Sequence, residues 1–498
     1  MELLNNLVFG FSVALTWQNL WFCFIGVFLG TLIGVLPGIG PLATIAMLLP
    51  ITFNVPPVAA LIMLAGIYYG AQYGGSTTAI LVNLPGETSA VVTCIDGYQM
   101  ARQGRAGPAL AIAAVGSFFA GTVCTLIIAL FGPPLAELAL KFGAPEYSSL
   151  MLMGLVAAAV LAGDNMTKAL AMVVMGLLLG IVGTDVNSGM ARYSFGIPEL
   201  TDGIGFIVIA VGVFAVGEIV SNLGETEHRM VFTDKVTGLM PTRKDLKDSF
   251  WPIVRGTGIG AFLGVLPGTG PAIASFSSYM LEKKLAKDPS RFGKGAIEGV
   301  AGPESANNAD AQCKFIPTLT LGIPASAVMA LMLGALTIQG IAPGPQVMTQ
   351  KPDLFWGLVA SMWIGNLMLL VLNLPLIGLW VSLLKVPYRL LFPAIMAFSC
   401  IGIYSVNNSP FELYLTAIFG IIGLVWMRLD MPPAPMLLGF VLGPLMEENL
   451  RRALLISRGD PTVFFTRPIS LGFMITTVLI IVIMVLPAVK ARRAAITG

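Results

Sequence analysis

Two short motifs rich in proline and glycine lie inside apolar segments and could bind ions. The first, GVLPGIGP, covers residues 34–41, and the second, GVLPGTGP, covers residues 264–271. Proline removes a backbone N–H and glycine tolerates unusual backbone angles, so each motif should interrupt a helix. Carbonyl groups freed at such a break can coordinate Na⁺, and the N-terminus of the next helix can face an anion. The residues assigned to these ion-binding breaks are Pro37, Gly38, Gly40, Pro41, Pro267, Gly268, Thr269, Gly270 and Pro271.

The alternative for each motif is a kink that only lets two helices pack closely. An isolated Pro-Gly pair favours the kink, whereas two copies at matching places in two halves favour a binding site. We therefore predict two broken helices whose breaks bind ions.

A second pair of breaks follows, LPGETSAV at residues 84–91 and GIPASAV at residues 322–328. Hydroxyl side chains gather around both, although Ser and Thr often bond only to their own helix. These hydroxyl residues are Ser76, Thr77, Thr78, Thr88, Ser89, Ser305, Thr318, Thr320 and Ser326. Asn307 and Asn308 could cap a helix or donate amide N–H groups to a carboxylate, and we favour the second role. The predicted substrate-binding residues are Asn83, Pro85, Gly86, Thr88, Ser89, Asn307, Asn308, Pro324 and Ser326.

Several ionisable residues lie in or beside apolar segments, where an acid is a functional candidate by default. They are Glu87, Asp164, Lys168, Asp185, Glu218, Glu304, Asp310 and Lys314. We interpret Asp164, Lys168 and Asp185 as residues at helix ends. Glu87, inside a break, is either a site residue or a helix cap. Since no Arg lies within the motifs, helix N-termini, hydroxyls, amides and co-bound cations would have to hold a multiply charged anion.

Composition identifies lipid as the solvent of most of the chain. Of 498 residues, 56% are hydrophobic and only 11% are charged, so a soluble domain could not cover its surface. A net charge of +2 gives no reason to expect nucleic acid as a partner. One histidine, five scattered cysteines without a CxxC pair, and no HExxH or GxSxG context argue against an intramembrane enzyme. We expect no cofactor and no metal beyond a coupling ion, Na⁺ or H⁺.

Apolar segments of membrane length recur along the chain and predict an all-α polytopic membrane protein with roughly 12 transmembrane helices of about 20 residues. The N-terminal residues 1–18 contain no Lys or Arg and do not resemble a cleaved signal peptide, so we expect the first span after them, at residues 19–35. Shorter apolar pieces near 42–53, 80–95 and 272–281 predict half-spans or arms of re-entrant hairpins. The predicted spans are 19–36, 56–72, 108–131, 147–162, 168–184, 203–222, 251–266, 315–340, 354–373, 389–404, 411–427, 432–446 and 468–489.

The ordered series of motif pairs predicts two repeats, and loop charge predicts that they are inverted. Basic residues are numerous at residues 282–295 in the second half and absent from the matching loop of the first half, near residues 50–57. At the next junction the first half carries the basic residues instead, at residues 96–107. Loops 96–107 and 282–295 should therefore be cytoplasmic, as should the C-terminus with Lys490, Arg492 and Arg493. We predict a first membrane repeat at 1–224, a cytoplasmic linker at 225–250 and a second membrane repeat at 251–467. A last transmembrane helix with a short tail follows at 468–498.

Four sequence features together resemble the large membrane subunit, TctA, of the tripartite tricarboxylate transporters over nearly the whole chain. They are the two GVLPGxGP motifs, the YGG-S-T-T…N-LPGE-S hairpin followed by DGYQMARQGRAG, and GPESANNADA…IPTLTLGIPAS. The resemblance implies an elevator-type transporter of the bacterial cell inner membrane. It also implies a small four-helix membrane subunit (TctB-like) and a periplasmic solute-binding protein (TctC-like) as partners, with uptake generally driven by Na⁺.

We accordingly expect a permease subunit that takes up di- or tricarboxylates of the citrate type with an ion gradient, and no enzyme activity. An autonomous Na⁺/carboxylate symporter without a binding protein is the main alternative. An intramembrane enzyme and a passive channel are the others, and broken inverted repeats suit alternating access better than a channel.

Overall fold

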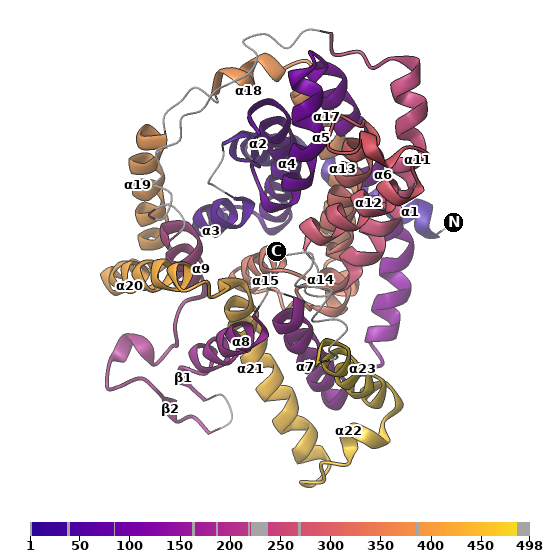
Figure 1. The fold of residues 1–498 in the computed structure, drawn as a ribbon. Helices are drawn as coiled ribbons and strands as arrows, with labels where there is room; N and C mark the ends of the chain where they lie inside the picture. Colours follow the sequence, from indigo (N-terminus) through magenta and orange to yellow (C-terminus); the bar gives the residue numbers. More distant parts are fainter. Residues whose placement is uncertain are drawn as a thin grey trace.

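The computed structural model describes residues 2–36, 40–83, 85–161, 165–185, 188–217, 220, 238–266, 270–383 and 388–485. The fold is all-α, with 80% of residues in helices (Figure 1). Within the described ranges the exception is one antiparallel hairpin, in which β1 (Gly183–Thr184) pairs with β2 (Ala191–Arg192). Several predicted features fall outside the described residues. They are Pro37, Gly38, Pro267, Gly268, Thr269, Asp164, Glu218, residues 225–237 of the predicted linker, and the C-terminal Lys490, Arg492 and Arg493.

The first part of the chain forms long helices separated by short breaks. In chain order the elements are α1 (Glu2–Ala14), α2 (Trp17–Val35), α3 (Pro41–Thr52), α4 (Pro57–Val82), η1 (Thr88–Ala90), α5 (Val91–Arg102), α6 (Ala106–Ala139), α7 (Ala144–Leu161), α8 (Met166–Gly180), η2 (Pro198–Leu200), α9 (Phe206–Ala210) and the π-helix η3 (Val211–Val216).

The second part begins with α11, whose first turns lie within the segment predicted as a linker. The elements are α11 (Arg243–Val265), α12 (Pro271–Leu285), η4 (Pro289–Arg291), α13 (Glu298–Cys313), α14 (Phe315–Leu321), α15 (Ala327–Ile338), α16 (Gln346–Gln350), α17 (Pro352–Asn373), α18 (Ile377–Leu383), α19 (Tyr388–Asn407), α20 (Pro410–Arg428), α21 (Pro433–Ile456), α22 (Val463–Thr466) and α23 (Pro468–Val485).

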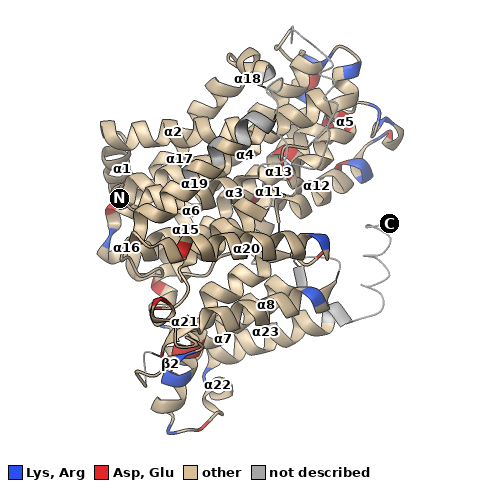
Figure 2. Ribbon diagram, turned by 90° about the vertical axis from the view of Figure 1, so that its left-hand side faces the viewer, with Lys and Arg blue, Asp and Glu red and all other residues tan. Residues whose placement is uncertain are grey.

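Four described helices are long and apolar enough to cross a membrane, namely α2, α6, α17 and α20. Shorter apolar helices accompany them, as expected where spans are broken. Lys and Arg residues lie mostly at helix ends and in loops, including the ends of α5 and α12 (Figure 2). The chain is therefore a multi-pass membrane protein, while the number of twelve spans stays a prediction.

Helix α2 approaches α4 closely through a stripe of glycines. A Cβ atom added at any of three glycines would lie far inside contact distance of a backbone oxygen of α4. The pairs are Gly26 with Met63 at 2.3 Å, Gly30 with Ile67 at 2.5 Å and Gly34 with Ala71 at 2.3 Å. Only glycine permits such backbone contact, which is a common way to join helices in membranes.

Helix α11 approaches α13 in the same manner. The pairs are Gly256 with Gly302 at 2.2 Å, Gly260 with Ala306 at 2.1 Å and Gly264 with Asp310 at 2.5 Å. These glycines follow those of α2 by 230 residues, the spacing of the two PGxGP motifs. Their partners follow those on α4 by 239 residues, the spacing of Pro85 and Pro324. Two sequence offsets thus relate one helix pair to the other.

The helices end where the motifs predict breaks. Helix α2 ends at Val35 and α3 begins at Pro41, with Gly40 at its N-cap. Helix α11 likewise ends at Val265 and α12 begins at Pro271, with Gly270 at its N-cap. Proline suits the first helical position because its missing N–H would have no partner there.

The second pair of breaks uses left-handed C-caps at equivalent positions. Helix α4 ends at Asn83, with φ of 60°, and α14 ends at Gly322, with φ of 71°. These two residues are also 239 apart in the chain. Asparagine and glycine are the residues that accept this conformation most readily, which gives Asn83 a structural reason to be asparagine.

The loops that follow α5 and α12 meet at one end of the molecule. Asp96 of α5 accepts backbone hydrogen bonds from Gly293 at 2.9 Å and from Gly295 and Ala296 at 2.8 Å. The Gln103 amide also donates to the carbonyl oxygen of Lys294 at 2.8 Å. The two basic loops predicted to share one side of the membrane are therefore in direct contact.

Candidate functional site

A carboxylate that is completely buried, Glu304 of α13, lies at the centre of a polar cluster. The hydroxyl of Ser76 on α4 donates to Glu304 Oε2 at 2.5 Å, and the hydroxyl of Thr93 on α5 donates to Oε1. Asn307 Nδ2 is a longer donor at 3.4 Å from Oε2. Glu304 thus joins α13 to two helices of the first half of the chain.

No Lys or Arg within the described ranges forms an ion pair with Glu304. A buried carboxylate without a cation is costly, and three hydrogen bonds offset only part of that cost. A proton or a bound cation must therefore compensate the charge. Buried carboxylates of this kind inside a membrane, without a cationic side chain beside them, are typical of ion and proton pathways.

Asn308 extends the cluster toward α6. Its amide Nδ2 donates to the hydroxyl of Ser117 at 2.7 Å, to the carbonyl oxygen of Glu304 at 3.0 Å and to Asn307 Oδ1 at 2.5 Å. The structure therefore brings both predicted asparagines beside Glu304. Their predicted contact with substrate stays a prediction.

The first hairpin holds a neighbouring polar group around Glu87. The hydroxyl of Ser89 donates to Gln72 Oε1 at 2.9 Å and also to Glu87 Oε1. Gly86 has a packing role, because an added Cβ would lie 2.0 Å from the carbonyl oxygen of Gly34 on α2. Pro85 precedes this contact in the chain, and Thr88, which follows it, is the first residue of η1.

The predicted residues of the second hairpin have a local role. Ser326 caps α15, where its hydroxyl accepts the backbone N–H of Met329 at 3.4 Å. Within the described ranges no hydrogen bond connects Ser326 to Glu304 or to Asn307. Pro324 lies between Gly322, the C-cap of α14, and Ser326.

A buried ion pair one to two turns beyond the asparagines was not among the predicted site residues. Lys314 Nζ lies 2.5 Å from Asp310 Oδ2, and both side chains are completely buried. Asp310 Oδ1 has no hydrogen-bond partner within the described part of the chain. Lys314 is thus a buried cationic group at the C-cap of α13, the helix that carries Glu304.

Sequence reasoning noted Glu304, Asp310 and Lys314 as ionisable residues in an apolar context but did not assign them to the site. It counted Ser76 only among the hydroxyls near a break. No local pattern pointed to Thr93 or Ser117, because their hydrogen-bond partners lie far along the chain. The same holds for Gln72, whose contact with Ser89 depends on how the hairpin folds.

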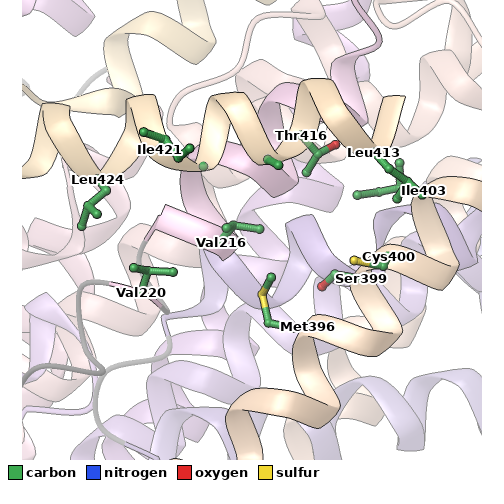
Figure 3. A pocket seen from close by; sticks show the side chains of 12 residues that line it. Val216, Val220, Met396, Ser399, Cys400, Ile403, Leu413, Thr416, Ile421 and Leu424 are labelled. Atoms are coloured by element: carbon green, nitrogen blue, oxygen red, sulfur yellow. The ribbon is translucent and has the colours of Figure 1, made fainter. Parts of the chain in front are cut away.

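A cavity outside the Glu304 cluster lies between η3, α19 and α20 (Figure 3). Its volume is about 260 Å³, and among the described residues of its lining Ser399 and Thr416 carry the hydroxyl groups and none is charged. This lining offers a carboxylate less than the polar cluster around Glu304 does.

Comparisons with known proteins agree with the motifs. A model of the tripartite tricarboxylate transporter TctA family matches residues 20–438. An uncharacterized 52.8 kDa protein in the TAR-I ttuC′ 3′ region of Agrobacterium vitis is 60% identical over 493 residues, which cover 99% of this chain and 98% of that protein. An uncharacterized protein in the TAR-II ttuC′ 3′ region of the same organism is 60% identical over 234 residues, which cover 47% of this chain and 97% of that protein. No solved structure matches.

Proposed function

Because this chain belongs to the tripartite tricarboxylate transporter TctA family, we propose that it is the large permease subunit of a secondary transporter. It takes up di- or tricarboxylates of the citrate type and couples uptake to an ion gradient, with Na⁺ as the coupling ion. The observation that carries this proposal is Glu304, a buried carboxylate that pairs with no Lys or Arg among the described residues and is held by hydroxyls from the opposite half of the chain.

Electrostatics gives a reason for coupling at this site. A substrate carboxylate about 4 Å from an ionised Glu304 would be repelled by roughly 4 kcal/mol at an effective dielectric of about 20. A cation bound with the substrate offsets this repulsion. Lys314 supplies a further positive charge for a substrate carboxylate, and Asn307, Asn308, Asn83 and the hydroxyls of the hairpins supply hydrogen bonds.

The proposed architecture is an elevator built from two inverted repeats, with roughly 12 spans. Its divisions are the predicted ones, at residues 1–224, 225–250, 251–467 and 468–498. Support comes from the two glycine stripes 230 residues apart and from the left-handed caps Asn83 and Gly322, 239 residues apart. The contact between loops 96–107 and 282–295 agrees with one cytoplasmic side.

The Na⁺ sites of this proposal include the backbone carbonyls of the two PGxGP breaks. The partners are a small four-helix TctB-like membrane subunit and a periplasmic TctC-like binding protein that delivers the carboxylate. The protein would lie in the bacterial cell inner membrane with its C-terminus in the cytoplasm, and it would need no cofactor.

Reconstituted transport tests the proposal. Proteoliposomes containing this chain and its small membrane partner would be supplied with labelled di- and tricarboxylates, with and without an inward Na⁺ gradient and the binding protein. Uptake that requires both would support the tripartite symporter. Uptake with the gradient alone would instead identify an autonomous symporter, and no uptake of any carboxylate by correctly inserted protein would overturn the proposal.

A further inference from the structure

A small polar cavity adjoins the Glu304 cluster, between α4, α6 and α17. Its volume is about 10 Å³, enough for about one water molecule or one small dehydrated ion. Oxygen-bearing side chains in its lining are Tyr73, Ser76, Thr77, Ser117 and Asn373. Each of these residues is at most 5% exposed, so the cavity lies in the interior of the protein.

Two of these oxygen atoms have no partner. The Tyr73 hydroxyl and Asn373 Oδ1 form no hydrogen bond with any described residue. The Asn373 amide nitrogen donates to the carbonyl oxygen of Leu369 at 2.9 Å, which leaves the amide oxygen as the free group. Buried polar atoms are usually satisfied in folded proteins, and two unpartnered oxygens that line one small cavity can share a ligand there.

The remaining groups connect the cavity to the buried charge. Ser76 uses its hydrogen to bond Glu304, and Ser117 accepts the amide hydrogen of Asn308, so both hydroxyl oxygens keep a lone pair for another partner. The cavity therefore presents oxygen acceptors, with a carboxylate on the far side of Ser76. Neither Lys nor Arg lines it.

We infer that this cavity binds one dehydrated Na⁺ ion, coordinated by Tyr73, Ser76, Ser117 and Asn373 and balanced by the charge of Glu304. Oxygen ligands are those that hard cations prefer. The site is separate from the carbonyl groups of the PGxGP breaks. Its role in coupling rests on the proposed function, but its affinity for Na⁺ does not.

An ion in this cavity would contact both halves of the chain. Its lining comes from α4 and α6 in the first half and from α17 in the second, and Glu304 belongs to α13. An ion at this point would hold together the hydroxyl donors of one half and the acid of the other. Its loss would leave Glu304 uncompensated and weaken that contact.

Sodium binding to purified protein in detergent tests the inference without any transport step. Thermal unfolding would be followed during NaCl titration, with choline chloride keeping the ionic strength constant. We expect a saturable, Na⁺-specific rise in Tm for the wild type. In Tyr73→Phe and in Asn373→Leu the apparent Kd for Na⁺ should rise about tenfold, the lower end of what disturbing a metal shell costs.

Tyr69→Phe is the matched control. Tyr69 lies one turn earlier on α4, is equally buried, and does not line the cavity. Its variant should bind Na⁺ as the wild type does. Tyr73→Phe removes a hydroxyl that has no hydrogen-bond partner in the described structure, so it should fold normally even if Asn373→Leu does not.

Three results would overturn the inference. One is a wild type whose Tm rises equally with Na⁺ and choline, which would mean that the cavity holds only water. Another is a Tyr73→Phe variant that titrates like the wild type. The third is an equal loss of affinity in Tyr69→Phe. A failure of carboxylate uptake together with intact Na⁺ binding would refute the proposed function and leave this site standing.

Discussion

The α2–α4 and α11–α13 helix pairs have the same backbone packing but different chemistry. Both pairs meet through three glycines four residues apart. At the spacing of 239 residues that relates α4 to α13, Glu304, Asn307 and Asn308 correspond to Ala65, Tyr68 and Tyr69. The repeated feature is therefore the close helix contact. The acid and the amides belong to one copy only.

The first half contributes hydroxyl groups to the acid of the second half. Ser76 and Thr93 donate to Glu304, and Ser117 accepts from Asn308. A symmetric pair of sites would need an acid in each half, and α4 has none. The two helix pairs thus share a packing mode, while the polar cluster around Glu304 has its acid on α13 and its hydroxyl donors on α4 and α5.

The largest expected effect concerns the charges that only α13 carries. Lys314→Met should lower the free energy of unfolding by about 3–5 kcal/mol, because it leaves Asp310 buried and unpaired. The double variant Lys314→Met with Asp310→Asn should recover most of that loss. Denaturant titration in detergent measures both, and an undiminished stability of the single variant would show that the ion pair is not needed.

The same double variant separates packing from function. Ala71 and Gly75 in α4 correspond to Asp310 in α13 and to Lys314 at its C-cap, so neutral residues are compatible with this helix contact. We expect the double variant to fold and to lose carboxylate uptake. Normal uptake would remove Lys314 from the proposed substrate site.

Glu304→Gln should reduce uptake by about 100-fold, which corresponds to about 2.7 kcal/mol. Glutamine keeps one acceptor oxygen for Ser76 or Thr93, but its amide nitrogen cannot accept from the other hydroxyl, and it cannot carry the charge that compensates a cation. Uptake into proteoliposomes, at equal amounts of inserted protein, measures the effect. The control is Glu298→Gln on the same helix, whose exposed pairing with Arg291 should contribute less than about 1 kcal/mol. Equal losses in the two variants would argue against a special role for Glu304.

Adding one methyl group should affect the two glycine contacts alike. Gly30→Ala and Gly260→Ala should each destabilise by about 1–3 kcal/mol, because the new Cβ would press on a backbone oxygen. Gly258→Ala, in the same helix as Gly260, meets nothing within 4 Å and should be neutral or stabilising by up to about 1 kcal/mol. Thermal unfolding distinguishes these outcomes. A large difference in stability between Gly30→Ala and Gly260→Ala would show that the two glycine contacts are not equivalent.

The smallest effect concerns how the two glycine helices begin. Helix α11 starts with a capping box formed by Thr242 and Asp245, whereas Thr16 makes no side-chain cap for α2. Asp245→Asn should cost about 1 kcal/mol at neutral pH, and the matched Thr16→Val should cost less. Denaturant titration in detergent would show whether the cap matters more for α11.

This cost should depend on pH. Burial alone would raise the pKa of Asp245, but hydrogen bonds from Thr242 and Arg105 outweigh it and lower the pKa below its ordinary value of 3.8. A carboxyl with a lowered pKa stabilises the fold above its ordinary pKa and loses this effect as the pH falls through the lowered value. The gap between wild type and variant should stay constant above the ordinary carboxyl pKa and close as the pH falls through the lowered value. A gap that does not close would mean that the carboxylate charge does not act there.

Local sequence features predicted much of the scaffold. Proline at the first helical position places the starts of α3 and α12, and glycine or asparagine in the left-handed region ends α4 and α14. Asn307 and Asn308 were predicted as site residues because their amide N–H groups could bind a carboxylate near the second break. Asn83 and Ser326 were predicted because they lie in the breaks themselves, and the structure gives both of them helix-capping roles.

What the sequence by itself determined is therefore the set of apolar helices, their breaks and the unusual polarity of residues 298–314. These depend on the properties of neighbouring residues and on membrane solvation. Only the tertiary structure decided which polar residues form hydrogen bonds with one another. Ser76 and Thr93 reach Glu304 across 228 and 211 residues of chain, and no local pattern encodes a contact of that range. The glycine stripes hold α4 against α2 and α13 against α11, because backbones can touch only where no side chain stands between them.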